Sequence, residues 1–507
     1  MQIHWQYGLV KVVALIILLT VGCSQRPSVQ LETESPRDRL QRELTEIFEF
    51  PAFANAFWGV AIQSLQTGEY LYLRNANKGF IPASNMKLLA TAVALVKLGP
   101  DFVYQTDIFL NGQKISDERL VGDLVVRGSG DPGIGGHFVN SGKRDAMLQI
   151  FKEWAGEIKN KGIKTIEGHL VGDDNCFSDQ VLGHGWAWND ESEWYAAQNT
   201  ALSFNDNCLD LYISPADSIG KLATIETFPR TNYVQITNEV FTVENNQQTH
   251  VYFERVRGTN KLMVSGSIAI NSNTIKDHAT IENPTLYFVS VFKDVLVNEG
   301  LEVKGQAFDI DDLAGYNYHP SDSNRIIRHT SPPLSELIKK TNKDSQNLWA
   351  ELLLRTLGRQ FNGVGSYPRS IEVIKTFLSQ IGIDPEMTAI SDGSGLSRLN
   401  LLSPLQVITI LRYLYRHPHF EVFYNSLSVA GVDGTLRGRM RGTLAENNIR
   451  AKTGTLNRVK ALSGYLTTRD GEDLVFSMTC NNYTVPTSMV SNMQDLVCER
   501  LANFSKR

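Results

Sequence analysis

The sequence predicts a multidomain α/β (α+β) protein in which a long β-rich segment is inserted into a region of alternating helices and strands. The chain has 507 residues, and a single hydrophobic core stops growing at roughly 250–300 residues, so two or more domains are expected. Apolar residues recur at helical spacing near both ends of the chain. Between about residues 103 and 320, short β-type runs separated by Gly, Asn, Asp and Pro dominate instead.

The elements before the β-rich segment form a hairpin and a helix. Strands are expected at residues 57–62 and 70–73, and Gln66-Thr67-Gly68 between them is a turn signal. Pro82 is well placed in the first turn of an apolar helix that runs over residues 88–98.

The β-rich segment is predicted to form one or two inserted modules that close with a helix over residues 286–297. Its strands are expected at residues 123–127, 209–213, 233–237, 250–255 and 262–268. After about residue 330 helices are expected at 334–341, 348–357, 371–381 and 404–415. The chain then ends with strands at 450–453, 460–468 and 473–480 and a helix at about 490–501.

The N-terminal segment predicts export. Lys11 precedes an apolar run over residues 12–22, which has the length of a signal-peptide apolar region and is shorter than a membrane-spanning helix. Small residues before Cys23 resemble a bacterial lipoprotein cleavage site, so residues 1–23 are expected to be a lipoprotein-type signal peptide with Cys23 lipidated. Plain secretion is the alternative, and either route leads to the cell envelope or periplasm. Residues 24–37 are expected to be a polar tether.

Charge and composition exclude several other classes of protein. The net charge of −5 is too small and too acidic to predict a nucleic-acid partner. No other stretch has 18 apolar residues in a row, so the mature chain is not expected to span a membrane. The four cysteines after Cys23 match no zinc-binding spacing. Export permits disulfides among them, and both paired and free buried thiols stay open.

The first of three short motifs provides a nucleophile and a base. Ser84-x-x-Lys87 opens the apolar helix, and residues three apart lie on one helix face, so the Lys87 amine can reach the Ser84 hydroxyl. A serine hydroxyl needs an adjacent base to become a good nucleophile, and a partly desolvated lysine can be that base.

The second and third motifs follow the β-rich segment. Ser345-x-Asn347 lies between two predicted helices, where a loop can project both side chains into a cleft. Lys452-Thr453-Gly454 occurs once, on a strand that enters a hairpin. Lys452 provides positive charge for a carboxylate or a proton relay, and the glycine permits close approach of a substrate backbone.

The three motifs in this order resemble the penicillin-binding protein and serine β-lactamase superfamily. Further segments resemble one subgroup of it, the penicillin-binding protein 4 type, or peptidase S13, group of D-alanyl-D-alanine carboxypeptidases and endopeptidases. These segments are residues 172–174, 185–186, 201–205, 391–398 and 430–436. The long insert between the first and second motifs is a hallmark of that group, and the resemblance covers about residues 40–500.

The resemblance implies a transpeptidase-like domain, in which an antiparallel sheet has helices on both sides. This domain would be assembled from residues 38–105 and 321–507, with residues 106–320 as inserted domains II and III. It also implies a peptidoglycan peptide as substrate, cleaved at a D-alanyl bond through an acyl-enzyme, and β-lactam antibiotics as covalent inhibitors.

The resemblance further implies roles for the motif residues. Ser84 would attack the D-Ala carbonyl with Lys87 as base, Ser345 and Lys452 would pass a proton to the leaving amine, and Asn347 would hold the substrate amide.

The same resemblance places substrate contacts on the third motif and in the insert. The backbone N–H groups of the nucleophile and of Thr455 would form an oxyanion hole, in which each donor contributes roughly 3 kcal/mol. Thr453 and Thr455, which flank Gly454, would bind the terminal carboxylate. In the family an acidic residue of the insert and an arginine near the Gly-Ser-Gly loop help to recognise the peptide side chain. Asp173 and Arg398 are the candidates for these two positions.

Two other functions stay open. A β-lactamase or esterase would use the same acylation chemistry, but it needs a deacylating device such as a water-activating glutamate, which the sequence does not locate. A non-catalytic muropeptide-binding envelope protein would have lost a motif residue, and none is lost. Serine acyl transfer of this kind needs no metal, so no cofactor is expected. The sequence leaves open the balance between carboxypeptidase and endopeptidase activity and the oligomeric state.

Overall fold

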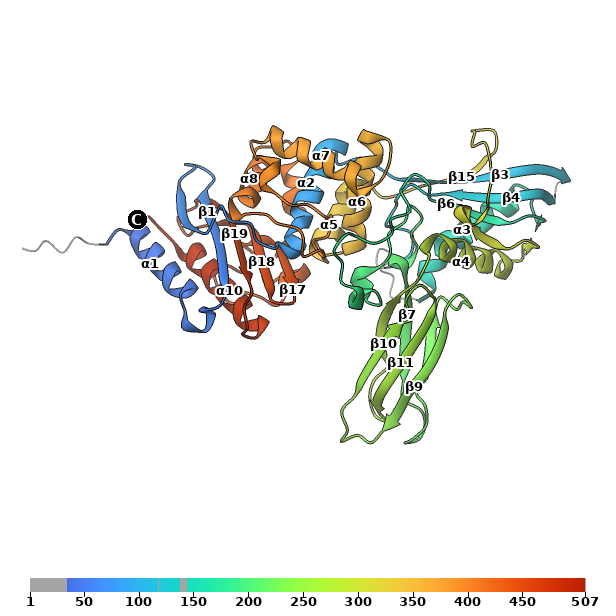
Figure 1. The fold of residues 1–507 in the computed structure, drawn as a ribbon, viewed down its shortest axis with the longest axis horizontal. Coiled ribbons are helices and arrows are strands. Elements are labelled where there is room, and N and C mark those ends of the chain that lie inside the picture. The colour runs from blue at the N-terminus through green and yellow to red at the C-terminus, as the bar shows by residue number, and fades with distance from the viewer. Residues whose placement is uncertain (1–33, 117, 137–143, 507) are drawn as a thin grey trace, which may run out of the picture.

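A six-stranded antiparallel sheet lies at the centre of one half of the molecule (Figure 1). The computed structural model describes residues 34–116, 118–136 and 144–506. Along the sheet the strands follow the order β16-β17-β18-β19-β1-β2, so both ends of the chain pair within it. The strands are β1 (Phe57–Ser64), β2 (Tyr70–Arg74), β16 (Ser428–Val429), β17 (Arg450–Leu456), β18 (Val459–Thr467) and β19 (Asp473–Asn481).

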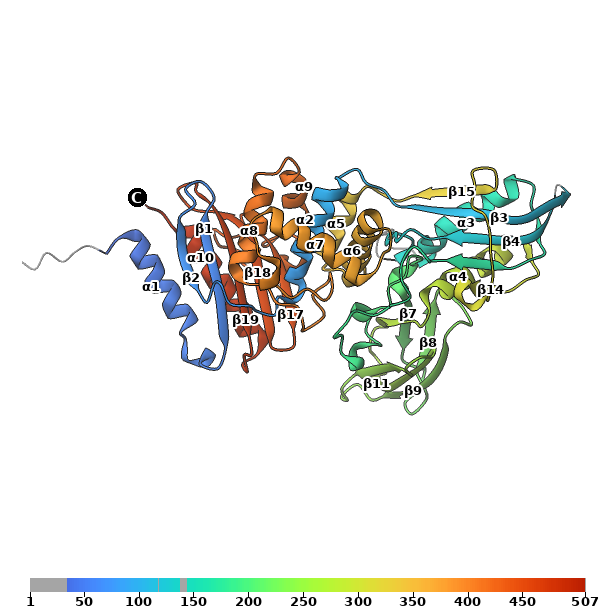
Figure 2. The same cartoon turned by 45° about the horizontal axis from the view of Figure 1, so that its top comes forward.

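Helices cover both faces of this sheet because its strands are apolar on both sides. In β1, Val60 and Ile62 pack into one core, whereas Ala61 between them packs into the other, as the alternation of side chains along a strand requires. The first core contains α1 (Pro36–Phe48) and α10 (Thr487–Asn503). The second contains α2 (Met86–Leu98), α5 (Leu334–Lys343), α6 (Asn347–Asn362), α7 (Tyr367–Gln380), α8 (Pro404–Tyr415) and α9 (Phe420–Ser426) (Figure 2). The predicted antiparallel sheet with helices on both sides is confirmed.

The other half of the molecule is an arm that comprises residues 105–330, and the rest of the described chain is called the sheet domain below. A seven-stranded sheet in the arm has the order β13-β5-β4-β3-β15, with β6 and β14 attached to it. Its elements are β3 (Gln105–Ser116), β4 (Arg119–Arg127), β5 (Thr165–Ile166), β6 (Leu170–Asp173), β13 (Glu302–Val303), β14 (Ala307–Asp309) and β15 (Arg325–Thr330). Helices α3 (Gln149–Asn160) and α4 (Pro284–Asn298) pack into the same core.

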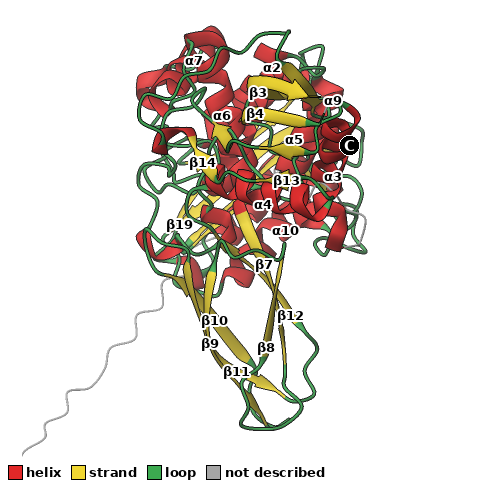
Figure 3. Ribbon diagram, turned by 90° about the vertical axis from the view of Figure 1, so that its right-hand side faces the viewer, coloured by secondary structure: helices red, strands yellow, loops and turns green. Residues whose placement is uncertain are grey.

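Two three-stranded sheets project from the arm as a separate lobe (Figure 3). One has the order β12-β7-β8 and the other β10-β11-β9. The strands are β7 (Cys208–Ser214), β8 (Thr224–Phe228), β9 (Gln235–Val243), β10 (His250–Arg255), β11 (Lys261–Ala269) and β12 (Ile275–Thr280). The β-rich character predicted for the insert is therefore correct.

Two details of the insert differ from the prediction. Helix α3 was not predicted, although Phe151, Trp154, Ala155 and Ile158 are buried at helical spacing along it. The predicted start of the second catalytic segment at residue 321 is also too early. Strand β15 pairs antiparallel with β3, so residues 325–330 belong to the sheet of the arm.

The cysteines and the termini add little to the architecture. Cys176 is half-buried, Cys208, Cys480 and Cys498 are buried, and all four are free thiols. Cys23 and the predicted signal peptide lie outside the described residues. Within the described part of the chain, every helix is too short or too polar to cross a lipid bilayer.

Candidate active site

A cavity of about 860 Å³ opens between the sheet domain and the arm. All three motifs contribute to its wall, through Ser84, Ser345, Asn347, Thr453 and Thr455. These side chains come from segments up to 371 positions apart in the chain (84 to 455), and the six-stranded sheet with its helices brings them together.

The nucleophile candidate lies in a single 3-10 turn, Ala83–Asn85, immediately before α2. Lys87 is fully buried, and its Nζ donates a hydrogen bond to Ser84 Oγ at 3.1 Å. The same amine donates to Asn347 Oδ1 at 2.6 Å and to the backbone carbonyl of Ser394 at 2.8 Å. Three acceptors from three segments therefore fix the position of one amine.

The environment of Lys87 lowers the pKa of its amine toward neutral pH. Burial lowers the pKa of Lys87 to about 7, and the nearby carboxylates of Glu351 and Asp392 act in the opposite direction. A pKa of about 7 leaves about half of the amine neutral at pH 7, against about one part in 3,000 for a lysine with its ordinary pKa. Only the neutral amine has a lone pair that can accept the Ser84 proton.

A second serine–lysine pair faces the cavity from the other two motifs. Lys452 Nζ donates to Ser345 Oγ at 2.8 Å and to the carbonyl of Thr453 at 2.9 Å. Ser345 lies between α5 and α6 with φ at 61°, a left-handed conformation that is strained for serine. Burial and the neighbouring Lys87 charge lower the pKa of Lys452 well below its usual value.

Two glycines permit the close packing around the candidate nucleophile, Ser84. A Cβ atom at Gly454 would lie 2.8 Å from the carbonyl oxygen of Pro82 and 3.1 Å from the backbone nitrogen of Ser84. A Cβ atom at Gly395 would lie only 1.8 Å from the carbonyl oxygen of Ala83, and Gly395 has φ at +85°. Strand β17 and the loop at residue 395 thus approach the nucleophile turn to distances that only glycine permits.

A row of hydroxyl groups continues along β17. Thr453 Oγ1 donates to Thr435 Oγ1 at 2.8 Å, and Thr435 also lines the cavity. Thr455 Oγ1 accepts a hydrogen bond from Lys460 Nζ at 2.8 Å. Thr435 was not among the predicted site residues, although it lies in the segment 430–436 that carried part of the family resemblance.

Asn347 connects Lys87 to the arm. Its Oδ1 accepts from Lys87, as described above, and its Nδ2 donates to the backbone carbonyl of Tyr195 at 2.8 Å. The Tyr195 hydroxyl in turn donates to Asp190 Oδ1 at 3.2 Å, and both Tyr195 and Asp190 line the cavity. In this structure the Asn347 amide thus joins the arm and Lys87 in one hydrogen-bond network.

Of the two residues predicted to contact the substrate side chain, the structure places only one at the cavity. Arg398 lines the cavity, and its guanidinium donates to the carbonyl of Asn457 at 3.0 Å. Asp173 does not line it. This residue ends β6, and its carboxylate accepts hydrogen bonds from the Tyr318 hydroxyl and from the backbone N–H of Asn175 at 3.1 Å. The acidic residue that the arm contributes to the cavity is Asp190, four residues after Trp186.

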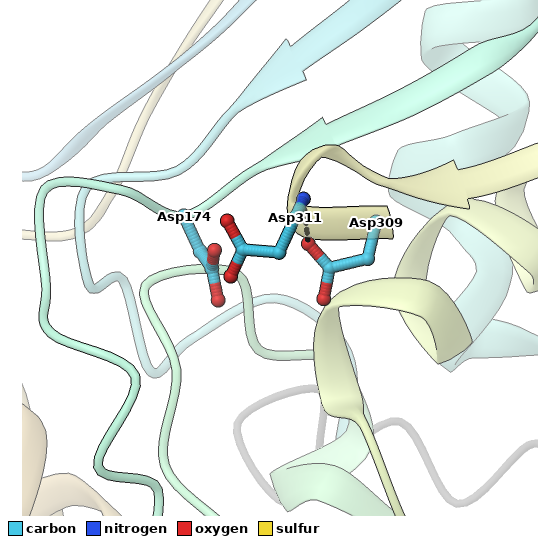
Figure 4. A group of neighbouring side chains, drawn as sticks. All are labelled: Asp174, Asp309 and Asp311. Carbon is cyan, nitrogen blue, oxygen red and sulfur yellow. Dashed lines mark hydrogen bonds between the residues drawn. The ribbon is translucent and has the colours of Figure 1, made fainter. Parts of the chain in front are cut away.

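A separate group of carboxylates lies in the arm (Figure 4). Oxygen atoms of Asp174, Asp309 and Asp311 lie within 4.8 Å of one another, and the Thr285 hydroxyl donates to Asp174 Oδ2 at 2.6 Å. Burial and then repulsion from Asp309 raise the pKa of Asp174 to about 7. Burial raises the pKa of Asp309 to about 6. None of the three lines the cavity, so this group is distinct from the candidate active site.

Comparison with known proteins supports the family predicted from the motifs. The profile of the "D-Ala-D-Ala carboxypeptidase 3 (S13) family" matches residues 40–504. The D-alanyl-D-alanine carboxypeptidase of Actinomadura sp. (strain R39) is 31% identical over 504 residues, which cover 97% of this chain and 89% of that protein. The D-alanyl-D-alanine carboxypeptidase DacB of Haemophilus influenzae is 27% identical over 87% of this chain and 91% of its own length.

A solved structure has the same fold. The crystal structure of penicillin-binding protein 4 from Haemophilus influenzae superimposes with a TM-score of 0.78 at 24% identity and covers 91% of this chain and 99% of its own. A complex of that protein with a β-lactam superimposes with a TM-score of 0.72. Since the family profile spans almost the whole described chain and the fold agrees, this protein belongs to the D-Ala-D-Ala carboxypeptidase 3 (S13) family of penicillin-binding peptidases.

Proposed function

We propose that this protein is a serine-type D-Ala-D-Ala carboxypeptidase, a DD-endopeptidase or both, and that it cleaves D-alanyl bonds of peptidoglycan peptides through an acyl-enzyme on Ser84. The observation that carries the proposal is the hydrogen bond of 3.1 Å between the buried Lys87 amine and the Ser84 hydroxyl at the edge of a large cavity. A buried amine with a pKa of about 7 is suited to general-base catalysis at neutral pH.

Acylation begins with proton transfer from Ser84 to Lys87. The neutral amine keeps two hydrogens, which donate to Asn347 Oδ1 and the Ser394 carbonyl, so its lone pair is directed at Ser84 Oγ. The Ser84 oxygen forms a bond with the carbonyl carbon of the D-alanyl peptide, and the carbonyl π electrons move to its oxygen. The backbone N–H groups of Ser84 and Thr455 stabilise that oxyanion, and loss of one such donor typically costs 10²–10³-fold in rate.

Collapse of the tetrahedral intermediate requires a proton on the leaving amine. Ser345 donates its hydroxyl proton to this nitrogen as the C–N bond breaks, and Lys452 replaces it through the hydrogen bond of 2.8 Å. The lowered pKa of Lys452 favours this donation. The proton that Lys87 took from Ser84 then passes through water in the cavity to the neutral Lys452, which restores Lys87 as a base. A water molecule attacks the ester carbonyl, Lys87 takes a proton from that water and returns it to Ser84 Oγ as the ester bond breaks, and the shortened peptide is released.

The cavity wall also fits the two ends of the substrate. Thr453 and Thr455, on either side of Gly454, are assigned to the terminal carboxylate, and Thr435 adds a third hydroxyl beside them. Asp190 and Arg398 present opposite charges to the cavity. We assign the peptide side chain to this pair, with Asp190 in the role that the family resemblance had suggested for Asp173.

Penicillin labelling tests the proposed nucleophile. The full chain should form a stable adduct with a fluorescent penicillin, and Ser84→Ala should abolish it. Ser218→Ala is a matched control, because Ser218 belongs to a second Ser-x-x-Lys sequence on the surface of the arm, where it donates to Asp217. Labelling of the Ser84→Ala variant, or no labelling of the parent with intact antibiotic, would contradict the proposal.

The same assay separates the alternative functions. Rapid consumption of the antibiotic without a stable adduct would favour a β-lactamase, although no glutamate of the described chain lines the cavity to activate a deacylating water. Release of free D-alanine from a stem pentapeptide indicates carboxypeptidase activity. Conversion of a cross-linked muropeptide dimer to monomers indicates endopeptidase activity.

We also propose export to the cell envelope or periplasm with a lipid anchor on Cys23. Support comes from the apolar run and the small residues before this cysteine. Expression of the full chain in a bacterial host should place it in the membrane fraction, and Cys23→Ala should abolish processing at that site. A mature protein that remains soluble in the periplasm with an unmodified N-terminus would support plain secretion.

A further inference from the structure

A loop over residues 391–400 provides one of the three acceptors that fix the Lys87 amine. The Ser394 carbonyl accepts from Lys87 Nζ at 2.8 Å, and the next residue, Gly395, packs against the carbonyl of Ala83 in the nucleophile turn. The position of this loop therefore determines the direction of the Lys87 lone pair. None of the residues given a role above fixes the position of this loop.

A fully buried glutamate of α6 holds the loop from behind. Glu351 lies one helical turn after Asn347 and has no solvent exposure. Its Oε1 accepts from the backbone N–H of Ser394 at 2.7 Å and of Gly393 at 3.2 Å. Its Oε2 accepts from Gly393 at 3.1 Å. One carboxylate thus binds the peptide groups on both sides of Gly393, immediately before the carbonyl that Lys87 uses.

A second buried carboxylate shapes the rest of the loop. Asp392 accepts from the backbone N–H groups of Gly395 at 2.8 Å and of Ser397 at 2.6 Å. It also accepts from the Trp186 indole of the arm at 2.9 Å. Glu351 and Asp392 together bring two acidic groups into the interior next to the Lys87 amine, where burial of a charge is costly unless it is compensated.

We propose that Glu351 is a positioning residue for acylation of Ser84, which fixes the Ser394 carbonyl against Lys87 and stabilises the positive charge that Lys87 acquires when it takes the serine proton. This inference rests on the proposed acyl-enzyme function and adds a residue to it. Glu351 is not among the residues that line the cavity, so it acts on the substrate only through Lys87 and the loop.

The groups that face Glu351 come from four elements. They are Asp392 of the loop, Lys87 of α2, Arg355 one turn further along α6, and Tyr367 of α7. Burial raises the pKa of Tyr367 well above its usual value, so the phenol stays neutral between pH 5 and 9, whereas an arginine stays cationic there. Burial and then repulsion from Asp392 raise the pKa of Glu351 above its usual value.

Substitution by glutamine separates the charge of Glu351 from its hydrogen bonds. In Glu351→Gln the amide oxygen can occupy the Oε1 position and accept from both Gly393 and Ser394, while the negative charge is lost. Lys452, the charged group that faces Lys87 from β17, is unchanged. The pKa of Lys87 should then fall, because the Glu351 carboxylate raises it in the parent protein and loss of an opposite charge disfavours the ionised form of the amine.

The test measures the second-order rate of acylation by benzylpenicillin between pH 5 and 10. In Glu351→Gln the acidic limb of the pH–rate profile should move to lower pH by about 1 unit, and the rate at high pH should fall because the base is weaker. Glu351→Leu removes the loop anchor as well and should lower the rate at every pH by about 100-fold. Glu472→Gln is the control, since Glu472 is a half-buried carboxylate outside the cavity that accepts a hydrogen bond from Ser64 and pairs with Lys506.

The outcomes distinguish this inference from the proposed function. An unchanged acidic limb in Glu351→Gln overturns the inference, and it does so even if Glu351→Leu fails to fold. A wild-type rate in a folded Glu351→Leu variant also overturns it. Failure of the parent protein to form the Ser84 adduct would instead refute the proposed function.

Discussion

Substitution of Asn347 by aspartate changes the charge next to the proposed base with almost no change in shape. Asn347 Oδ1 lies 2.6 Å from Lys87 Nζ, so Asn347→Asp would place a carboxylate in direct contact with the amine. The other new oxygen would face the Tyr195 carbonyl, to which the amide now donates at 2.8 Å. The negative charge should raise the pKa of Lys87. The amine then stays protonated at neutral pH and has no lone pair to accept the Ser84 proton.

The size of the effect follows from the fraction of neutral amine. A contacting opposite charge shifts a pKa by roughly 1–3 units, which would move the pKa of Lys87 from about 7 to about 8–10. The neutral fraction at pH 7 then falls from about one half to between about one-tenth and one-thousandth. The rate of acylation at pH 7 should therefore fall roughly 5- to 500-fold and recover above the new pKa.

The assay is the pH dependence of acylation by benzylpenicillin. Asn347→Leu removes the acceptor without adding charge, so its rate should fall without a shift of the acidic limb to higher pH. Asn342→Asp makes the same chemical change in α5, where the side chain binds Thr91 and Ser426, and should leave the limb in place. An acidic limb in Asn347→Asp at the wild-type pH or lower would refute the assignment of Lys87 as the base.

Three further predictions concern Gly395 near Ser84, Asp174 in the arm, and the proposed contact of Asp190 with the substrate side chain. Gly395→Ala should lower both the melting temperature and the penicillin acylation rate because its Cβ atom would meet the nucleophile turn, whereas Gly382→Ala, at a similar φ of +82° with nothing within 4 Å, should retain wild-type acylation. Asp174 has a raised folded pKa of about 7, so its burial costs nothing below the unfolded pKa near 3.8, and stability is lost as the pH rises toward 7. Asp174→Asn should therefore increase the free energy of unfolding at pH 8 by up to about 4 kcal/mol, and so raise the melting temperature there. At pH 3.5 the melting temperature should be unchanged, and an equal gain at both pH values would contradict this account. Asp190→Asn should raise KM for a stem peptide at least about fivefold with little effect on penicillin acylation, and Asp173→Asn should affect neither; the opposite ranking in peptide hydrolysis assays would restore Asp173 as the side-chain contact.

The three motifs could be recognised in the sequence because each motif is short and lies within or beside one element. Ser84 and Lys87 are three residues apart at the start of a helix, so their contact follows from helix geometry alone. Ser345 and Asn347 flank a helix start, and Lys452 lies on a strand. The order of the motifs then suggested that they meet, and the structure brings them to one cavity.

The acidic residue of the arm was not predictable in the same way. Asp173 and Asp190 lie in similar acidic and glycine-rich surroundings, and their sequences do not reveal which carboxylate faces the cavity. Asp173 is turned away because it ends β6, which pairs with β4 so that Asp173 lies opposite Arg127. Asp190 reaches the cavity through a loop whose position depends on contacts with Asn347, a residue more than 150 positions away in the chain.

Helix α3 and the boundary near residue 321 were also not predicted correctly, because stronger sequence patterns obscured them. Helix α3 carries Phe151, Trp154 and Ile158 at helical spacing, but it lies within a long segment dominated by strands. The boundary near residue 321 was misplaced because β15 is a short strand whose partner, β3, lies more than 200 residues earlier. Pairing between such distant segments depends on the tertiary fold, which local propensity does not record.

The connection between Lys87 and Asn347 also sets the order of events during synthesis of the chain. These residues are 260 positions apart, which corresponds to roughly 10–50 s of translation at about 5–20 residues per second. During that interval the α2 segment lacks the partners that desolvate its lysine, so Lys87 is an ordinary protonated amine and Ser84 an ordinary alcohol. Hydrolytic activity therefore arises only when the C-terminal third has folded onto the N-terminal hairpin. An incomplete chain has no activated serine and hydrolyses no peptide bond.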